Sequence, residues 1–190
     1  MCGIAGYVGD RESADVLVDA LSKLEYRGYD SAGIAVFDHG NIKVKKCKGR
    51  LANLVEKMDE EGKPQGHVGI GHTRWATHGE PSDINSHPHG NKRVTIVHNG
   101  IIENYKKLKD FLVAEGYSFA SETDTEVAAK LLDYYYDGDP MKTIAKVLSE
   151  IKGSYALGIM FRDFPDEIFA VRKDLSLIHI SEPTRLDVIS

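Results

Sequence analysis

Apolar residues recur along this 190-residue chain with two different spacings, which predicts a mixture of helices and strands. The three-to-four-residue spacing of amphipathic helices occurs at 13–25, 50–58, 105–115, 123–136 and 140–151. Short apolar or alternating runs, typical of strands, occur at 4–8, 32–37, 42–46, 66–71, 94–97, 154–161 and 168–171. Because these elements follow one another in blocks rather than as strict β-α-β units, we expect an α+β fold with antiparallel sheet packed against helices.

Polar residues and glycines at the ends of these segments predict several boundaries. Ser13 and Asn104 are expected to cap helices, since their side chains can accept hydrogen bonds from first-turn N–H groups. Gly116 fits the stop of the helix that begins at 105. The segment 38–41 contains Gly and Asn, which tolerate positive φ, and therefore predicts a β-hairpin.

Two stretches, 25–33 and 71–89, follow neither period and are rich in Gly, His, Asn and Pro. We interpret both as ordered loops. Loops of this length inside a compact domain are often functional.

Composition narrows the class of protein. A net charge of −5 without a long basic run gives no electrostatic footprint for nucleic acid. No stretch approaches the roughly 20 apolar residues of a membrane span, and the acidic residues at 10–15 argue against a signal peptide. We therefore expect a cytoplasmic protein with neither a nucleic-acid nor a membrane partner, whose two cysteines, Cys2 and Cys47, are free thiols.

Cys2 follows the initiator methionine directly. Once Met1 is removed, Cys2 carries both a thiol, with an ordinary pKa of about 8.5, and an α-amine of about 7.7–8.0 that can act as its base. The alternative is a small apolar residue that opens a buried strand.

Other residues supply the remaining parts of an amide-cleaving site. Asn99 and Gly100 offer a carboxamide and a backbone N–H for an oxyanion, although Asn-Gly is equally typical of a type I′ hairpin turn. The Arg74 guanidinium can bind a carboxylate through two hydrogen bonds, and the alternative is that Arg74 is an ordinary surface arginine in a loop. Asp124 can bind an ammonium group, because a Thr123–Glu126 capping box leaves its carboxylate free.

Five histidines, at positions 72, 78, 87, 89 and 98, lack the spacing of a metal site, and no phosphate-binding glycine loop is present. We expect neither a metal nor a cofactor.

Five motifs in order resemble the N-terminal glutaminase domain of glutamine–fructose-6-phosphate aminotransferases, which belong to the N-terminal-nucleophile, or class II, amidotransferases. The motifs are MCGI at 1–4, YRGYDSAG at 26–33, HTRWATHG at 72–79, HNGIIEN at 98–104 and SETDTE at 121–126.

The resemblance implies a four-layer αββα sandwich of two mostly antiparallel sheets between helices. It implies that Cys2 is the nucleophile and that Asn99 and Gly100 form the oxyanion hole, without a metal. Trp75 would belong to a closing lid. The substrate-binding residues implied in this way are Arg27, Arg74, Trp75, Thr77, His78 and Asp124.

The implied reaction is hydrolysis of L-glutamine to glutamate and ammonia, which supplies nitrogen for glucosamine-6-phosphate synthesis. An isomerase domain that binds fructose 6-phosphate is absent from this chain, and the full-length enzyme is expected to be a homodimer. The alternatives are the glutaminase part of another class II amidotransferase, or a truncated fragment that binds glutamine without activity.

The resemblance covers residues 1–174, which we interpret as a glutaminase domain that lacks the C-terminal strands of the family. Residues 175–190 are unlike the family, and we interpret them as a non-native junction.

Overall fold

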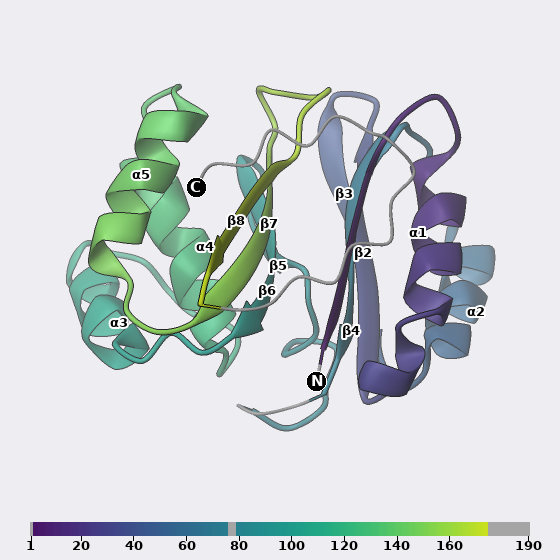
Figure 1. Ribbon diagram of the computed structural model, residues 1–190, viewed down its shortest axis with the longest axis horizontal. Coiled ribbons are helices and arrows are strands. Elements are labelled where there is room, and N and C mark those ends of the chain that lie inside the picture. Colours follow the sequence, from purple (N-terminus) through teal and green to yellow (C-terminus); the bar gives the residue numbers. More distant parts are fainter. Residues whose placement is uncertain (1, 76–78, 175–190) are drawn as a thin grey trace.

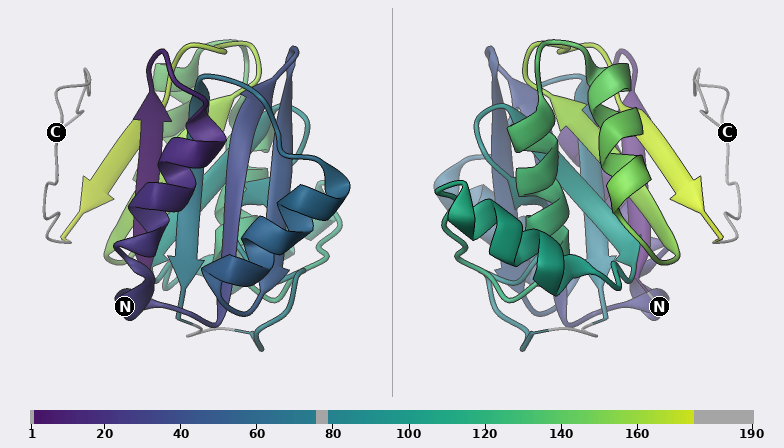
Figure 2. Two further views of the ribbon diagram at one scale, coloured as in Figure 1. Left: turned by 90° about the vertical axis from the view of Figure 1, so that its right-hand side faces the viewer. Right: turned by 90° about the vertical axis from the view of Figure 1, so that its left-hand side faces the viewer.

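The computed structural model describes residues 2–75 and 79–174, and these form the four layers expected (Figure 1). Two sheets pack face to face in the middle, and helices cover the outer face of each (Figure 2). One sheet is covered by α1 (Ser13–Ser22) and α2 (Leu51–Glu61). The other is covered by α3 (Tyr105–Ala114), α4 (Asp124–Tyr135) and α5 (Pro140–Glu150).

Both sheets are antiparallel throughout the described residues. The first has the strand order β1-β4-β2-β3 and the second the order β5-β6-β7-β8. The first sheet consists of β1 (Gly3–Val8), β2 (Ser31–Asp38), β3 (Asn41–Lys48) and β4 (Val68–Arg74). The second consists of β5 (His89–Gly90), β6 (Val94–Gly100), β7 (Tyr155–Phe161) and β8 (Phe169–Lys173). The α+β class is confirmed.

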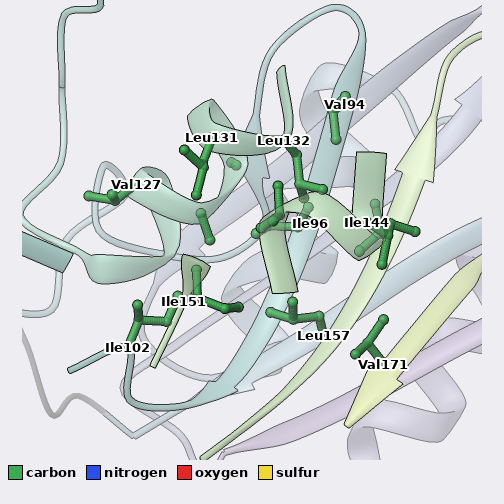
Figure 3. Close-up of a cluster of buried hydrophobic side chains, with 14 of the residues drawn as sticks. Val94, Ile96, Ile102, Val127, Leu131, Leu132, Ile144, Ile151, Leu157 and Val171 are labelled. Atoms are coloured by element: carbon green, nitrogen blue, oxygen red, sulfur yellow. The ribbon is translucent and has the colours of Figure 1, made fainter. Parts of the chain in front are cut away.

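Three apolar cores hold the layers together. The largest lies between α3, α4, α5 and the second sheet, where Leu131, Ile96 and Leu157 meet (Figure 3). A second core joins α1 and α2 to the first sheet, and a third fills the space between the two sheets. Each fully buried aliphatic side chain contributes about 1.5–3 kcal/mol.

Alternation along β4 separates two of these cores. Val68 and Ile70 face the second sheet. Gly69 and Gly71 face α1, where a Cβ on Gly71 would lie 3.0 Å from Leu21 Cδ1. The two glycines therefore allow α1 to pack closely on the sheet.

Two strands extend beyond their apolar runs. β4 continues to Arg74, which pairs with Ser31, and β6 continues to Gly100, which pairs with Tyr155. Arg74 therefore ends a strand instead of lying in a loop, and the hairpin-turn interpretation of Asn99-Gly100 is wrong. Pairing with neighbouring strands extends the ladder where local hydrophobicity has already ended.

The cap predicted at Ser13 is wrong, and the cap predicted at Asn104 is correct in position but makes no side-chain bond to the first turn. Glu12 occupies the cap position of α1, while Ser13 is its buried first residue and donates its backbone N–H to Gly66 O. Asn104 does precede α3, but its carboxamide bonds to Glu150 O and to the N–H of Lys152. Tertiary partners compete successfully with local capping.

The predicted stop and hairpin are present. Gly116 follows α3 with φ +90°, and a tight turn joins β2 to β3. The residues with positive φ in that turn are His39 and Gly40, while Asn41 already belongs to β3.

No helix among residues 2–75 and 79–174 has the length and apolar character needed to cross a bilayer. The tail interpreted as non-native, 175–190, lies outside the described residues.

Candidate functional site

Polar side chains replace apolar ones at one end of the space between the two sheets. Since residues two apart on a strand share a face, His72 continues the inward-facing side of β4 after Ile70, and Asn99 continues that of β6 after Val97. Cys2 stands before Ile4 on β1 in the same way. The end of the sandwich is therefore a polar site built by three strands.

Cys2 lies against the backbone that follows β4. Its Sγ accepts a hydrogen bond of 3.2 Å from the N–H of Trp75 and lies 3.5 Å from Trp75 O. Burial raises the pKa of the Cys2 thiol above its ordinary value, and the N–H of Trp75 opposes this effect without cancelling it. A thiol with a raised pKa stays protonated near neutral pH, so it needs a base before it can act as a nucleophile.

Asn99 reaches Cys2 from the opposite sheet. Its Nδ2 donates a hydrogen bond of 3.1 Å to the carbonyl oxygen of Cys2. The neighbouring Gly100 has φ +113°, and a Cβ there would lie 2.1 Å from Ser154 O. Only glycine fits this position without strain. The two residues predicted to form an oxyanion hole therefore end β6 beside Cys2.

Arg74 and Trp75 come together with Cys2, as predicted. Arg74 is 4% exposed, and its Nη2 donates to Gly79 O at 3.2 Å. The Trp75 ring is 47% exposed and meets the Tyr29 ring edge to face, with centroids 5.2 Å apart. A buried guanidinium and a half-exposed indole thus belong to the two consecutive residues whose backbone ends β4 and contacts the thiol.

The segment around Arg27 packs beside the site, although Arg27 itself points to a neighbour in the chain. A Cβ on Gly28 would lie 2.6 Å from the carbonyl carbon of Arg74, so the segment contacts the β4 backbone directly. The contact recorded for the Arg27 guanidinium among the described residues is with Tyr26, whose hydroxyl accepts from Nε at 3.0 Å.

Asp124 is buried at the start of α4, and its carboxylate has protein partners. Its Oδ2 accepts a hydrogen bond of 2.8 Å from the N–H of Ile102, and its Oδ1 lies 3.8 Å from His98 Nδ1. The expectation of a carboxylate left wholly for a ligand is therefore wrong. Asp124 also anchors the segment that follows Gly100.

The capping box that was expected to leave Asp124 free is half formed. The Thr123 side chain accepts from the N–H of Glu126. The Glu126 carboxylate instead accepts from the N–H groups of Ala120 and Ser121. Thr77 and His78, predicted to line the pocket, lie outside the described residues.

Sequence reasoning assigned no role to His72, which contacts Asn99 directly. Its Nε2 lies 2.9 Å from Asn99 Oδ1 and 3.0 Å from His98 O. The signal in the sequence was the inward-facing series Val68, Ile70, His72 on β4, in which a histidine occupies a core position.

His72 belongs to a buried group of rings. It stacks on His87 with centroids 4.1 Å apart, and His87 meets His89 edge to face. Burial lowers the pKa of all three side chains, that of His72 to about 3. In the part of the chain that the structure describes, no group of three or more His, Cys, Asp or Glu side chains is arranged to hold a metal ion.

Comparisons of the sequence with protein families and with curated proteins both point to glutamine amidotransferases. Residues 72–178, more than half of the chain, match the glutamine amidotransferase domain family. The glutamine–fructose-6-phosphate aminotransferases (isomerizing) of Clostridium tetani and Clostridium acetobutylicum are each 58% identical over 180 residues, which cover 94% of this chain. The chain spans 29% of the length of these curated relatives.

Solved structures share the fold. The glutamine phosphoribosylpyrophosphate amidotransferase from B. subtilis, complexed with ADP and GMP, superposes with a TM-score of 0.74 and 29% identity. That match covers 85% of this chain and 35% of the other. The four-layer architecture, the family match and the identity to the aminotransferases agree, and the chain therefore belongs to the glutamine amidotransferase domain family, of the N-terminal-nucleophile type.

Proposed function

We propose that this chain hydrolyses L-glutamine to L-glutamate and ammonia, with Cys2 as the nucleophile. The observation that carries the proposal is the position of the Asn99 amide, whose Nδ2 lies 3.1 Å from the carbonyl oxygen of Cys2. A thiol beside a carboxamide donor, both at the end of a sandwich of this family, is suited to attack on an amide carbonyl.

The chemistry follows from the raised pKa of the thiol. After removal of Met1, the freed α-amine of Cys2 takes the thiol proton, and the sulfur attacks the δ-carbonyl carbon of glutamine. Asn99 and Gly100 stabilise the oxyanion. The C–N bond then breaks as the α-ammonium returns the proton to the amide nitrogen, which leaves as ammonia, and water hydrolyses the resulting thioester to glutamate and the free thiol.

The ends of glutamine carry opposite charges, and the site offers a group for each. Arg74 binds the α-carboxylate, because a guanidinium forms two parallel bonds with it. Asp124 binds the α-ammonium through the part of its carboxylate not used by Ile102. Thr77, His78 and Arg27 complete the substrate pocket, and the Trp75 ring belongs to a lid over it.

The ammonia serves a further domain of a longer enzyme. The relatives of about three times this length are glutamine–fructose-6-phosphate aminotransferases, and identity of 58% favours this role over that of another class II amidotransferase. We infer that the longer enzyme has an isomerase domain that binds fructose 6-phosphate and uses the ammonia to make glucosamine 6-phosphate. We also infer that the full-length enzyme is a homodimer and is located in the cytoplasm. We further infer that residues 1–174 constitute the glutaminase domain and that the tail from 175, of which the family match includes only 175–178, is not native to it.

The decisive experiment measures the glutamate and ammonia that the protein releases from L-glutamine. The protein is first shown by intact mass to lack Met1. We expect equimolar products, and we expect Cys2→Ala to abolish both. Cys47→Ala is the matched control, since Cys47 lies in the core between α1, α2 and the first sheet. Product formation by Cys2→Ala, or a Met1-free chain that binds glutamine without turnover, would overturn the proposal.

A further inference from the structure

His72 lies between the two sheets and contacts the predicted oxyanion-hole residue. It comes from β4 of the first sheet, whereas Asn99 and His98 come from β6 of the second. The imidazole is 1% exposed. Among the described residues, Nε2 is the ring nitrogen with hydrogen-bond partners, and both partners, His98 O and Asn99 Oδ1, belong to β6.

The two neighbours of Nε2 determine which nitrogen carries the proton. His98 O is a carbonyl oxygen and can only accept, at 3.0 Å. Nε2 must therefore be protonated, and it donates to Asn99 Oδ1 at 2.9 Å as well. Nδ1 has no hydrogen-bond partner among the described residues, which fits the unprotonated nitrogen of a neutral ring.

This arrangement also determines the orientation of the Asn99 carboxamide. If the amide were turned by 180°, its NH₂ group would face the N–H of His72, and two donors would meet. The observed orientation directs Oδ1 to His72 and Nδ2 to the backbone of Cys2. A hydrogen bond accepted at Oδ1 also polarises the amide and makes its N–H groups stronger donors.

The surroundings keep the ring in one charge state and one place. Burial lowers the pKa of His72 to about 3, so the ring is neutral near neutral pH. His87 stacks on it at 4.1 Å with an interplanar angle of 14°, and His87 Nδ1 in turn accepts from the N–H of His98. The ring therefore cannot turn without breaking its contacts with His87 and with β6.

We propose that His72 is a positioning residue, which acts through Asn99 by holding its carboxamide with the N–H groups toward the oxyanion. The proposal rests on the proposed glutaminase function, since that function makes Asn99 an oxyanion donor. It assigns no proton-transfer step to His72. The histidine instead sets the direction and strength of a donor that Cys2 chemistry requires.

Kinetics of the full Met1-free chain test this role with His72→Phe, which keeps the ring shape and removes the donor. We expect kcat to fall about 10- to 100-fold and KM to stay nearly unchanged. The loss of kcat should not exceed that caused by removing an oxyanion donor outright. His72→Gln can present an amide N–H near the Nε2 position and should restore most of the rate. His67→Gln, at an exposed histidine, is the matched control.

A double-mutant comparison separates positioning from general structural damage. In an Asn99→Ala background, His72→Phe should have no further effect on kcat, because the group through which it acts is gone. An equal fold loss in both backgrounds would overturn the proposal. So would a rise in KM with kcat unchanged.

Nitrogen-15 NMR of the imidazole gives a readout that needs no turnover. We expect His72, assigned by its absence from the His72→Gln spectrum, to be neutral and Nε2-protonated from pH 5 to pH 8. An Nδ1-protonated or doubly protonated ring would overturn the proposal. If the wild-type chain released no ammonia, the glutaminase function would fail, and the spectra would still decide whether His72 holds Asn99.

Discussion

The backbone N–H of Trp75 donates a 3.2 Å hydrogen bond to Cys2 Sγ, which joins the first described residue of the chain to the residue directly after β4. The pairing of β1 with β4 brings this about, because Gly3 lies opposite Thr73. The thiol is thus held in place, yet burial raises its pKa. Position alone does not activate it, and a base must be supplied.

Removal of Met1 is therefore expected to control activity. Chain that retains Met1 lacks a free amine on Cys2 and should release no ammonia, whereas treatment with a methionine aminopeptidase should restore activity in proportion to the mass fraction lacking Met1. The rate should rise with pH to about 8, as the amine loses its proton. Equal activity of the two mass forms would contradict an α-amine base.

Only one of the two thiols should react with an electrophilic glutamine analogue, such as a glutamine-derived chloromethyl ketone. Cys2 is partly exposed beside Asn99, whereas Cys47 is 7% exposed within an apolar core that an analogue cannot enter. Peptide mass spectrometry should find the label on Cys2 alone, with Cys47→Ala labelled equally well. Label on Cys47 at a comparable rate would count against a glutamine site at Cys2.

Hydrophobic period was sufficient for the α+β class, because it is a local property of the chain, whereas the four layers and most of the site were expected from the family resemblance. The proximity of Cys2, Arg74, Trp75 and Asn99 was expected from a family resemblance and is what the structure displays. Their roles remain predictions. Arg27 and Asp124 differ, since the Arg27 guanidinium contacts the adjacent Tyr26, and the Asp124 carboxylate accepts from the N–H of Ile102, a contact that depends on how separate segments pack.

His72 was missed for a related reason. A histidine two residues after Ile70 on an apolar strand is naturally interpreted as a core residue. Only the packing of the two sheets against each other brings Asn99 Oδ1 to His72 Nε2. The missing side-chain cap bond of Asn104 has the same origin, because its Oδ1 accepts from the N–H of Lys152 instead of from an N–H in the first turn of α3. Local patterns do not contain that information.

Gly100 should be far less tolerant of a side chain than another glycine with positive φ. In Gly100→Ala the strained backbone and the contact with Ser154 O, 2.1 Å from the added Cβ, should together lower the free energy of unfolding by about 3 kcal/mol. Gly116 has φ +90° and nothing within 4 Å of such a Cβ, so Gly116→Ala should cost about 1 kcal/mol. Urea denaturation measures both, and equal losses would show that the close contact is relieved.

Stability should decrease in acid through Asp38. This buried carboxylate accepts from His39, which lowers its pKa to about 2, and also from the N–H of Gln65 and from Lys43. Because the pKa is lower in the folded state than the ordinary 3.9, the stabilisation is complete above about pH 4 and is lost as pH falls toward 2.

The comparison that isolates Asp38 is the difference in unfolding free energy between wild type and Asp38→Asn. We expect this difference to shrink by about 2 kcal/mol between pH 5 and pH 2, since the amide has no proton to gain. Urea denaturation at several pH values would measure it. A difference that stays constant over this range would show that Asp38 titrates at its ordinary pKa.

Asp124 combines a structural bond with a proposed contact to substrate, and one substitution separates the two. In the wild type the N–H of Ile102 donates to Asp124 Oδ2 at 2.8 Å. Asp124→Asn keeps a carbonyl oxygen that can accept this hydrogen bond but removes the negative charge. The melting temperature should change little. The KM for glutamine should rise about 10- to 100-fold, the equivalent of a charge-assisted hydrogen bond of about 1.5–3 kcal/mol.

A substrate without the α-amino group makes this test specific. Wild type should process 4-carbamoylbutanoate far less efficiently than glutamine, and Asp124→Asn should lose most of that discrimination, because no charge remains to recognise the ammonium. Asp19→Asn, at an exposed acid on α1 paired with Lys23, serves as the control and should behave like wild type. If Asp124→Asn still discriminated fully between the two substrates, the ammonium would be bound elsewhere, and the role of Asp124 would be limited to anchoring Ile102 beside the oxyanion hole.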